Sequence, residues 1–376
     1  MKTRLEINSD ILIWAVERAG FDVGEFSEKF PHLSAWLAGK KKPTLKQLKT
    51  FSQKVHIPFG YLLLKEPIVE QFPIPFFRTL QDGSNKLSLN VYDTILMLQQ
   101  RQNWISGYLQ ENDYDQLDFV GKFSQSNDIQ EIVDDIRKTL NLEDKWASKL
   151  SSWTIAKDFL TERVEDIGIF TVFNSIVGSN THRPIKVEEC RGFVLVDKYA
   201  PFMFINSADS IAAQIFTLAH ELAHIWLGKS AGFDFRQFLP ASDPTEIFCD
   251  KIAAEFLVPQ ILLSEALLKT DDVEELARIF KVSQLVIARR LLDLKKINRD
   301  EFLKFYEDYR QREFQKKESK ISGGDFYNTE KKRLGLRFAN YVYQAVQENK
   351  LLVRDAYQLT DLSGNTFHKF MKEHLY

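Results

Sequence analysis

The sequence has little cysteine, no long apolar run and no strong excess of charge of either sign. Two cysteines, Cys190 and Cys249, in 376 residues exclude a disulfide framework, and a reducing cytosol fits this composition. The apolar run at 11–16 is too short for a signal-peptide core or a membrane span. A net charge of -2 excludes a global field that attracts nucleic acid or anionic lipid. We therefore expect a cytoplasmic protein with no membrane partner.

The sequence also has no internal repeat and no glycine loop of the kind that binds phosphates. What it does have is an apolar content of 44%, enough to bury a large core and to build two or three domains. The helical and strand patterns predict an α+β fold that is mostly α. We expect a helical N-terminal module at 1–65, a linker and helical scaffold at 66–150, a central domain at 151–310, and a linker with a small helical domain at 311–376.

The most informative pattern is the pentapeptide His-Glu-Leu-Ala-His, in which His220 and His224 flank Glu221 and two small apolar residues. Two histidines four positions apart lie on one face of a helix, so both imidazoles can bind one metal ion. Zinc accepts neutral imidazole, and with three protein ligands it keeps a position open for water. The carboxylate of Glu221 would then lie beside that water, where it can accept a proton.

The surrounding residues place this pentapeptide in a helix. Good helix formers at 210–219 carry apolar residues at core spacing, and Gly228 is a plausible helix end. Ser207 or Asp209 is expected to cap the start. The alternative is a structural helix with two hydrogen-bonded histidines, but burying both beside a carboxylate is costly unless something organises them.

A third metal ligand is expected from the segment 243–259. Asp243-Pro244 is a helix-start signal, and the apolar stripe that follows ends at Pro259. Glu246 and Asp250 are four positions apart and share one face of this helix. We favour Glu246 as the ligand and Asp250 as the residue that holds a ligating imidazole in place.

Together, 220–228 and 246–259 resemble the ImmA/IrrE family of bacterial and phage metallopeptidases. The resemblance covers about 150–295 and implies a cytoplasmic, gluzincin-like zinc metalloendopeptidase. It also implies His220, His224 and Glu246 as the metal ligands and Glu221 as the catalytic base. Family members often act on a transcriptional repressor in stress or mobile-element regulation. Family members commonly have helices in the segment that corresponds to 273–292 of this sequence. The resemblance implies that these helices are a structural part of the peptidase domain.

Three β-rich runs at 167–173, 192–196 and 202–205 predict a small antiparallel sheet over the metal helix. An extended substrate can pair with an edge strand of such a sheet through main-chain hydrogen bonds. The segment 202–206 is nearest the metal helix in sequence, so Phe202, Phe204 and Asn206 are our prediction for that edge. A covered inner strand is the alternative.

The first 65 residues resemble an XRE-type helix-turn-helix module. Lys40, Lys41, Lys42 and Lys46 cluster on the side expected to face DNA, which suits phosphate contacts. However, only residues 31–35 separate Phe30 from Trp36, so the helix that would read the major groove is barely one turn long. The cluster is expected either to contact DNA without strong sequence specificity, to be solvated, or to border a protein-docking module.

The sequence thus predicts a zinc-dependent peptidase that cleaves a specific intracellular protein, such as a repressor encoded nearby. The alternative is a DNA- or partner-binding transcriptional regulator, or an antitoxin-like protein, whose metal site is structural or sensory. The glutamate at 221 favours the enzyme, because a purely structural site has no use for it. In the C-terminal segment, 361–368 predicts a turn before a terminal helix.

Overall fold

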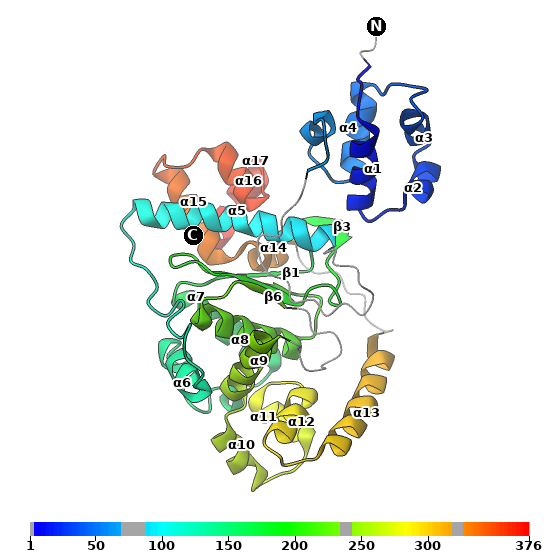
Figure 1. Ribbon diagram of the computed structural model, residues 1–376. Coiled ribbons are helices and arrows are strands. Elements are labelled where there is room, and N and C mark those ends of the chain that lie inside the picture. Colours follow the sequence, from blue (N-terminus) through cyan, green and yellow to red (C-terminus); the bar gives the residue numbers. More distant parts are fainter. Residues whose placement is uncertain (1–3, 69–87, 234–242, 318–325, 376) are drawn as a thin grey trace. The chain divides into compact units, whose positions relative to one another are not determined.

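The computed structural model of the chain describes residues 4–68, 88–233, 243–317 and 326–375 (Figure 1). Its contacts divide the chain into two compact units, one formed by Met1–Pro73 and Lys86–Asp93 and the other by the remainder. Helices predominate, and the described strands form a small sheet and a hairpin in the second unit, so the predicted α+β, mostly α fold is confirmed. The predicted borders at 150 and 310 fall inside the second unit. Within the described ranges, no helix is long and apolar enough to cross a bilayer.

Short helices around one apolar core make up the first unit. They are α1 (Ser9–Arg18), α2 (Val23–Lys29), α3 (His32–Leu37), α4 (Leu45–Lys54) and the 3-10 helix η1 (Phe59–Leu63). Thr44 caps α4, because its side chain accepts from the backbone N–H of Gln47 while the Gln47 side chain accepts from the Thr44 N–H. The buried side chains that close the core are Ile11, Leu12, Ala15, Val16, Phe26, Leu33, Leu48, Phe51 and Leu62.

The third helix of this unit is as short as the sequence indicates. Helix α3 has six residues, and Leu33 and Trp36 are buried in the core. Ser34 is exposed on the outer side of the helix, with His32 at its first turn. Few side chains of α3 therefore remain to contact anything outside the unit.

The second unit is built on a four-stranded sheet in the order β1-β5-β4-β6. These strands are β1 (Phe170–Asn174), β5 (Phe202–Asn206), β4 (Gly192–Leu195) and β6 (Ala231–Phe233), and a separate hairpin joins β2 (Ile176–Val177) to β3 (Asn180–Pro184). Strand β5 pairs antiparallel with β4 but parallel with β1, so the sheet is mixed rather than antiparallel. The chain leaves β1, forms the hairpin and β4, and returns through β5, which therefore runs in the direction of β1.

Strand β5 is an inner strand, so the expectation that it forms the substrate edge is wrong. Phe202, Phe204 and Asn206 are paired with residues of β1 on one side, and Phe202 and Phe204 are also paired with β4 on the other. Their backbone groups are occupied by the sheet and cannot bind an incoming strand. Asn206 is fully buried, and its Nδ2 donates to the carbonyl oxygens of Ile185 and Cys190 at 3.0 and 2.8 Å. Strand β5 is the strand that directly precedes the metal helix in the sequence, but this does not make it an edge strand. Strand β4 pairs with the side of β5 opposite β1.

One face of this sheet packs on helices α7 (Trp153–Asp166) and α8 (Ile211–Leu227), as Figure 1 shows. Nearly every residue of α8 from Gln214 onward is buried, which is expected of a helix that is apolar almost all round. The other helices on this side are α6 (Ile129–Thr139), η2 (Ala147–Lys149), α9 (Pro244–Leu257), α10 (Gln260–Leu267), α11 (Val273–Phe280), α12 (Gln284–Asp293) and α13 (Arg299–Lys317).

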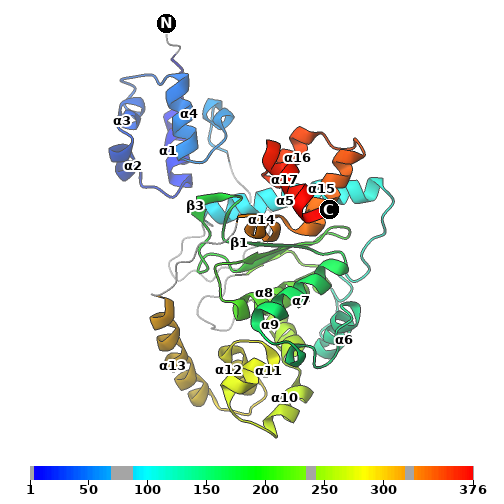
Figure 2. The ribbon, with the colours of Figure 1, turned by 180° about the vertical axis from the view of Figure 1, so that it is seen from behind.

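The opposite face of the sheet is covered by α5 (Leu89–Glu111) and by the C-terminal helices, seen from behind in Figure 2. These helices are α14 (Phe326–Leu334), α15 (Leu336–Gln347), α16 (Val353–Thr360) and α17 (Gly364–Leu375). Phe170 and Phe202 stack with their ring centroids 4.9 Å apart, and Phe338 of α15 meets both rings edge-on. Gln102 of α5 donates to the carbonyl oxygens of Leu195 and Ala200. The C-terminal helices are therefore part of the second unit's core.

Candidate metal centre

Helix α8 carries His220, Glu221 and His224 in the middle of the second unit. Ser210 caps its start by accepting from the N–H of Ala213, so neither Ser207 nor Asp209 is the cap. The reason is local, because Ser210 is the last residue with an extended backbone before the helix. At the other end Gly228 adopts a left-handed backbone with φ 69°, as the sequence predicts.

Helix α9 packs along α8 and brings the acidic residues to the histidines. Its predicted start is confirmed, since Asp243 accepts from the N–H groups of Thr245 and Glu246 and Pro244 occupies the first turn. Glu246 then lies one turn before Asp250. Both acids occupy the face of α9 that meets α8, as their contacts with the histidines require.

Three buried side chains converge on one point between these helices. His220 Nε2 and His224 Nε2 are 3.1 Å apart. Glu246 Oε2 is 3.1 Å from His220 Nε2, and Glu246 Oε1 is 3.2 Å from His224 Nε2. Four tetrahedral ligands at the usual zinc distances lie about 3.3 Å from one another. The His220–His224–Glu246 group therefore has the spacing and the donor types of a site that holds a divalent metal ion.

Asp250 contacts the ring nitrogen of His220 that faces away from Glu246 and His224. Its Oδ1 accepts from His220 Nδ1 at 2.9 Å. A histidine that donates from Nδ1 to a carboxylate presents a fixed Nε2 to the metal, because its ring orientation and tautomer are set. Cys249 lies between the two acids in the sequence and is fully buried. Burial raises the pKa of its thiol well above the ordinary value, so the thiol stays protonated.

The charges of this group alter one another's pKa values. Burial opposes a charge on His220, but hydrogen bonds with Asp250 and Glu246 outweigh it and raise the pKa of His220 to about 10. Burial likewise opposes a charge on Glu246, but its contacts with the two histidines lower the pKa of that carboxyl to about 2. Burial lowers the pKa of His224. His220 and Glu246 thus form an ion pair, and a metal ion would compete with the proton on His220 Nε2.

Glu221 is buried beside this group without a fixed partner. Among the residues that the structure describes, neither of its carboxylate oxygens has a hydrogen-bond partner. Burial raises the pKa of Glu221 well above its ordinary value, while the charge of His220 lowers it and that of Glu246 raises it. Buried polar atoms without partners are rare and require an explanation. A carboxylate that exchanges protons with a water beside a metal ion is such an explanation.

Gly192 is a site residue that the sequence pattern did not reveal. A Cβ atom at this position would lie 3.1 Å from Glu221 Oε1, 2.9 Å from the carbonyl oxygen of Phe204 and 2.4 Å from Thr217 Cγ2. Strand β4 can pass this close to α8 only because position 192 has no side chain. The sequence does show a glycine at the start of a β-rich run. Its proximity to Glu221, however, follows only from the order of the strands in the sheet.

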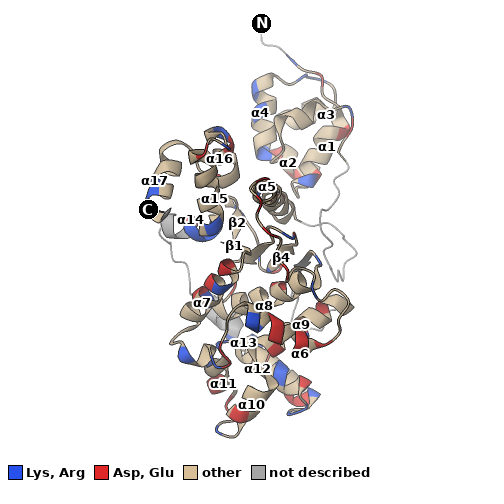
Figure 3. Cartoon of the chain, turned by 90° about the vertical axis from the view of Figure 1, so that its left-hand side faces the viewer, with Lys and Arg blue, Asp and Glu red and all other residues tan. Residues whose placement is uncertain are grey.

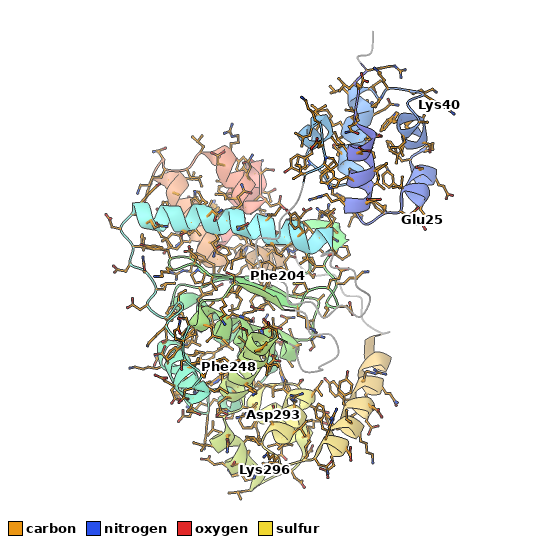
Figure 4. All side chains as sticks on the ribbon, viewed as in Figure 1. Glu25, Lys40, Phe204, Phe248, Asp293 and Lys296 are labelled. Atoms are coloured by element: carbon orange, nitrogen blue, oxygen red, sulfur yellow. The ribbon has the colours of Figure 1, made fainter. Side chains whose placement is uncertain are left out.

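The other predicted site residues are not among the side chains that converge at the metal centre. Phe204 stacks on Phe193 on the sheet face remote from α8, with ring centroids 4.9 Å apart (Figure 4). Four lysines of the first unit, hereafter the lysine loop, are exposed between α3 and the first turn of α4: Lys40, Lys41, Lys42 and Lys46. Lys42 pairs with Glu6 at 2.8 Å.

Comparison with known proteins identifies the part of the chain that carries the metal centre. Residues 164–292 match the family model described as the IrrE N-terminal-like domain, Peptidase_M78. This match supports a metallopeptidase-type family and agrees with the resemblance inferred from the two motifs. Residues 334–373 match a domain of unknown function, DUF8813. No curated protein and no solved structure matches the chain. The first unit lies outside both matched segments.

Proposed function

We propose that the second unit is a zinc-dependent endopeptidase that cleaves a specific protein in the cytoplasm, with His220, His224 and Glu246 as the metal ligands. The observation that carries this proposal is the convergence of these three buried side chains beside Glu221, whose carboxylate has no partner among the described residues. Two imidazoles and one carboxylate are the ligand set of zinc peptidases that keep a fourth position for water. A glutamate next to that position has no purpose in a structural site.

The chain's own residues account for the proton transfers. Bound zinc would supply Lewis acidity toward the scissile carbonyl and toward a water molecule. Glu221 accepts a proton from that water and later delivers it to the leaving amine. A nearby dication favours the ionised carboxylate and so opposes the rise in the pKa of Glu221 that burial produces. Asp250 keeps His220 in the orientation that this arrangement needs.

The proposed substrate is another protein, and the resemblance to the ImmA/IrrE family suggests a transcriptional repressor encoded nearby. Because β5 is an inner strand, an extended substrate would have to pair with another strand. In the described sheet, the outer strands are β1 and β6, and β6 lies next to β4, which carries Gly192. We therefore propose β6 as the strand with which the substrate pairs.

The decisive experiment compares wild type with Glu221→Gln. Each purified protein is incubated with the products of its neighbouring genes, and cleavage is followed by mass spectrometry. Glu221→Gln should retain one zinc per chain and lose cleavage, while Glu275→Gln, an exposed glutamate on α11, should cleave at the wild-type rate. Equal cleavage by wild type and Glu221→Gln would refute the catalytic role.

For the first unit we propose phosphate contacts with DNA through the lysine loop. Its four lysines are exposed and only one has an ion-pair partner among the described residues. The short α3 leaves few side chains for base edges, so we expect binding without strong sequence preference. If the wild-type protein retards a promoter fragment but leaves every neighbouring gene product intact, a regulator with a structural or sensory metal site is the better description.

A further inference from the structure

Two segments of the second unit have the same helix-turn-helix construction. Helices α11 and α16 each have eight residues. Each is followed by a residue with a left-handed backbone, Lys281 with φ 54° and Asp361 with φ 57°, and Gly364 at the start of α17 is left-handed as well, with φ 53°. A buried aliphatic residue and a serine complete each three-residue turn before the next helix begins. This spacing is typical of helix-turn-helix units.

The interior positions of the two second helices also correspond. Counted from the serine of the turn, the fourth, seventh and eighth residues are buried in both. In α12 they are Ile287, Arg290 and Leu291, and in α17 they are Phe367, Phe370 and Met371. Helix α15 packs against both α16 and α17, and its Phe338 also packs on the sheet, so these three helices form one end of the second unit's core. Helices α16 and α17 thus have the support that a recognition helix requires.

The outer faces of the two second helices differ completely. In α12 the second and fifth residues after the serine, Leu285 and Ala288, are buried against Phe302 of α13. The corresponding residues of α17 are Asn365 and His368, and both are exposed. The chain itself covers the outer face of α12, whereas Asn365 and His368 of α17 remain exposed, with the Tyr357 hydroxyl 3.5 Å from His368 Nε2.

The exposed face of α17 carries groups that suit nucleic acid. Besides Asn365 and His368 it presents Lys369 and Lys372, with Glu373 as the one acid, which lies 3.7 Å from Lys369. An asparagine amide can bond an adenine edge in the major groove, and lysine binds guanine or phosphate. The centre of a protein-protein interface is instead apolar and aromatic, and this face exposes no large apolar residue among those whose burial the structure describes.

The surroundings of α17 are basic as well. Residues 326–375 contain eight Lys and Arg against five Asp and Glu, and Figure 3 shows basic positions on α14 and α17. Two of the acids are occupied within the fold. Glu330 is buried and accepts from Arg333, and Asp361 accepts from the N–H of Ser179 in the β2–β3 turn. Four basic residues pair with acids of the same segment: Arg333, Lys350, Arg354 and Lys369. The net surplus of three positive charges is what remains to complement a phosphate backbone.

We propose that α15, α16 and α17 form a DNA-binding unit, in which α17 enters the major groove of duplex DNA. Asn365 and His368 face base edges, and Lys369 and Lys372 bind phosphates or guanines. This unit is distinct from the lysine loop and independent of the metal centre. The same construction at α11–α12 has become structural because α13 occupies its outer face.

The first test measures affinity for a fluorescein-labelled 30-base-pair duplex of random sequence, by anisotropy at several KCl concentrations, with the full chain. Lys369→Ala/Lys372→Ala should weaken binding on the order of tenfold and reduce the salt slope by about two, one for each lysine removed. The matched control is Lys295→Ala/Lys296→Ala, an exposed pair that follows α12 (Figure 4), which should bind as wild type does. Thermal unfolding of all variants verifies that they are folded.

The lysine loop must be separated from this effect. The same pair of α17 substitutions is therefore also made in a chain that carries Lys40→Ala, Lys41→Ala, Lys42→Ala and Lys46→Ala. A loss of affinity in both backgrounds supports the proposal. Unchanged affinity in both, or a wild-type chain that does not bind the duplex, overturns it. Unchanged DNA affinity with slower cleavage of a protein substrate also overturns it and identifies α17 as a protein-docking surface.

Sequence preference is tested by selection from a duplex library with a randomised centre. The wild-type chain should enrich a motif, and Asn365→Ala should lose the preference at one base pair without changing the salt slope. Enrichment of the same motif by Asn365→Ala would overturn the assignment of this residue to base recognition. Glu221→Gln should bind the library as wild type does, so the outcome does not depend on the proposed peptidase activity.

Discussion

The metal centre and the lysine loop both gather charged side chains, but they hold them in opposite ways. His220, His224 and Glu246 are buried and fix one another's protonation through contacts of 3.1–3.2 Å. The four lysines of the loop are exposed, and among the described residues only Lys42 has an ion-pair partner. Burial makes each charge depend on its neighbours, so a buried cluster limits the chemistry it can perform. Exposed charges are not constrained by neighbours in this way, so their function depends on the partner that they bind.

The largest effect is expected from removing a metal ligand. His224→Ala leaves two ligands, so the protein should purify without stoichiometric zinc and show no cleavage. Metal analysis after dialysis and a cleavage assay are the measurements. His182→Ala, which removes an exposed histidine on β3, should change neither. If His224→Ala retained one tightly bound zinc per chain, the buried cluster would not be the metal site.

Asp250→Asn is expected to have the next largest effect. The amide oxygen can still accept from His220 Nδ1 but carries no charge, so the imidazole becomes a poorer ligand. Zinc affinity should fall about 10- to 100-fold. Competition with a chromogenic chelator measures it. An unchanged affinity would mean that Asp250 merely fills space beside His220.

Gly192→Ala tests whether β4 must lie close to Glu221. The added methyl meets a strand carbonyl and Thr217, so it should destabilise the fold by about 1–3 kcal/mol and reduce the cleavage rate while zinc remains bound. Gly107→Ala is the matched control, because no atom lies within 4 Å of its Cβ and it is in a helix, where alanine should stabilise by about 0.5–1 kcal/mol. Denaturant unfolding distinguishes the two. A Gly192→Ala enzyme with full activity would show that the strand can move without consequence.

The metal-free protein should show the ion pair in its pH dependence. The raised pKa of His220 stabilises the fold below its ordinary value of 6.5, and this contribution is lost as the pH rises through about 10. Asp250→Asn removes part of that contribution. In EDTA, the difference in melting temperature between wild type and Asp250→Asn should be largest below pH 6.5 and should vanish toward pH 10. A difference that grows with pH would contradict the assigned charges.

The smallest effect is expected from the lysine loop. Replacing all four lysines by alanine should change the free energy of unfolding by no more than about 0.5 kcal/mol and leave zinc content unchanged, because exposed side chains contribute little to stability. Differential scanning calorimetry and metal analysis give both numbers. A large loss of stability would mean that these lysines are held by contacts, and the contrast with the metal centre would disappear.

The local features of the metal centre could be predicted from the sequence, and the long-range ones could not. The two histidines share a helix face because of their spacing, and Asp243-Pro244 marks the start of α9. Strand order depends on how the chain returns through β4, which no local pattern encodes, so β5 was mistaken for an edge. The contact between Gly192 and Glu221 follows from that order and was missed for the same reason. The predicted caps of α8 lie one and three residues before the observed cap, and small errors of this kind are common at helix ends.

The packing of Phe338 against Phe170 and Phe202 also constrains how the protein is made. Until α15 has emerged from the ribosome, these two sheet phenylalanines lack the ring that completes their cluster. The core on this face of the sheet is therefore completed late in synthesis. If the proposed peptidase activity is correct, we expect the nascent chain to lack it until the C-terminal helices have docked, which delays any attack on neighbouring proteins during translation.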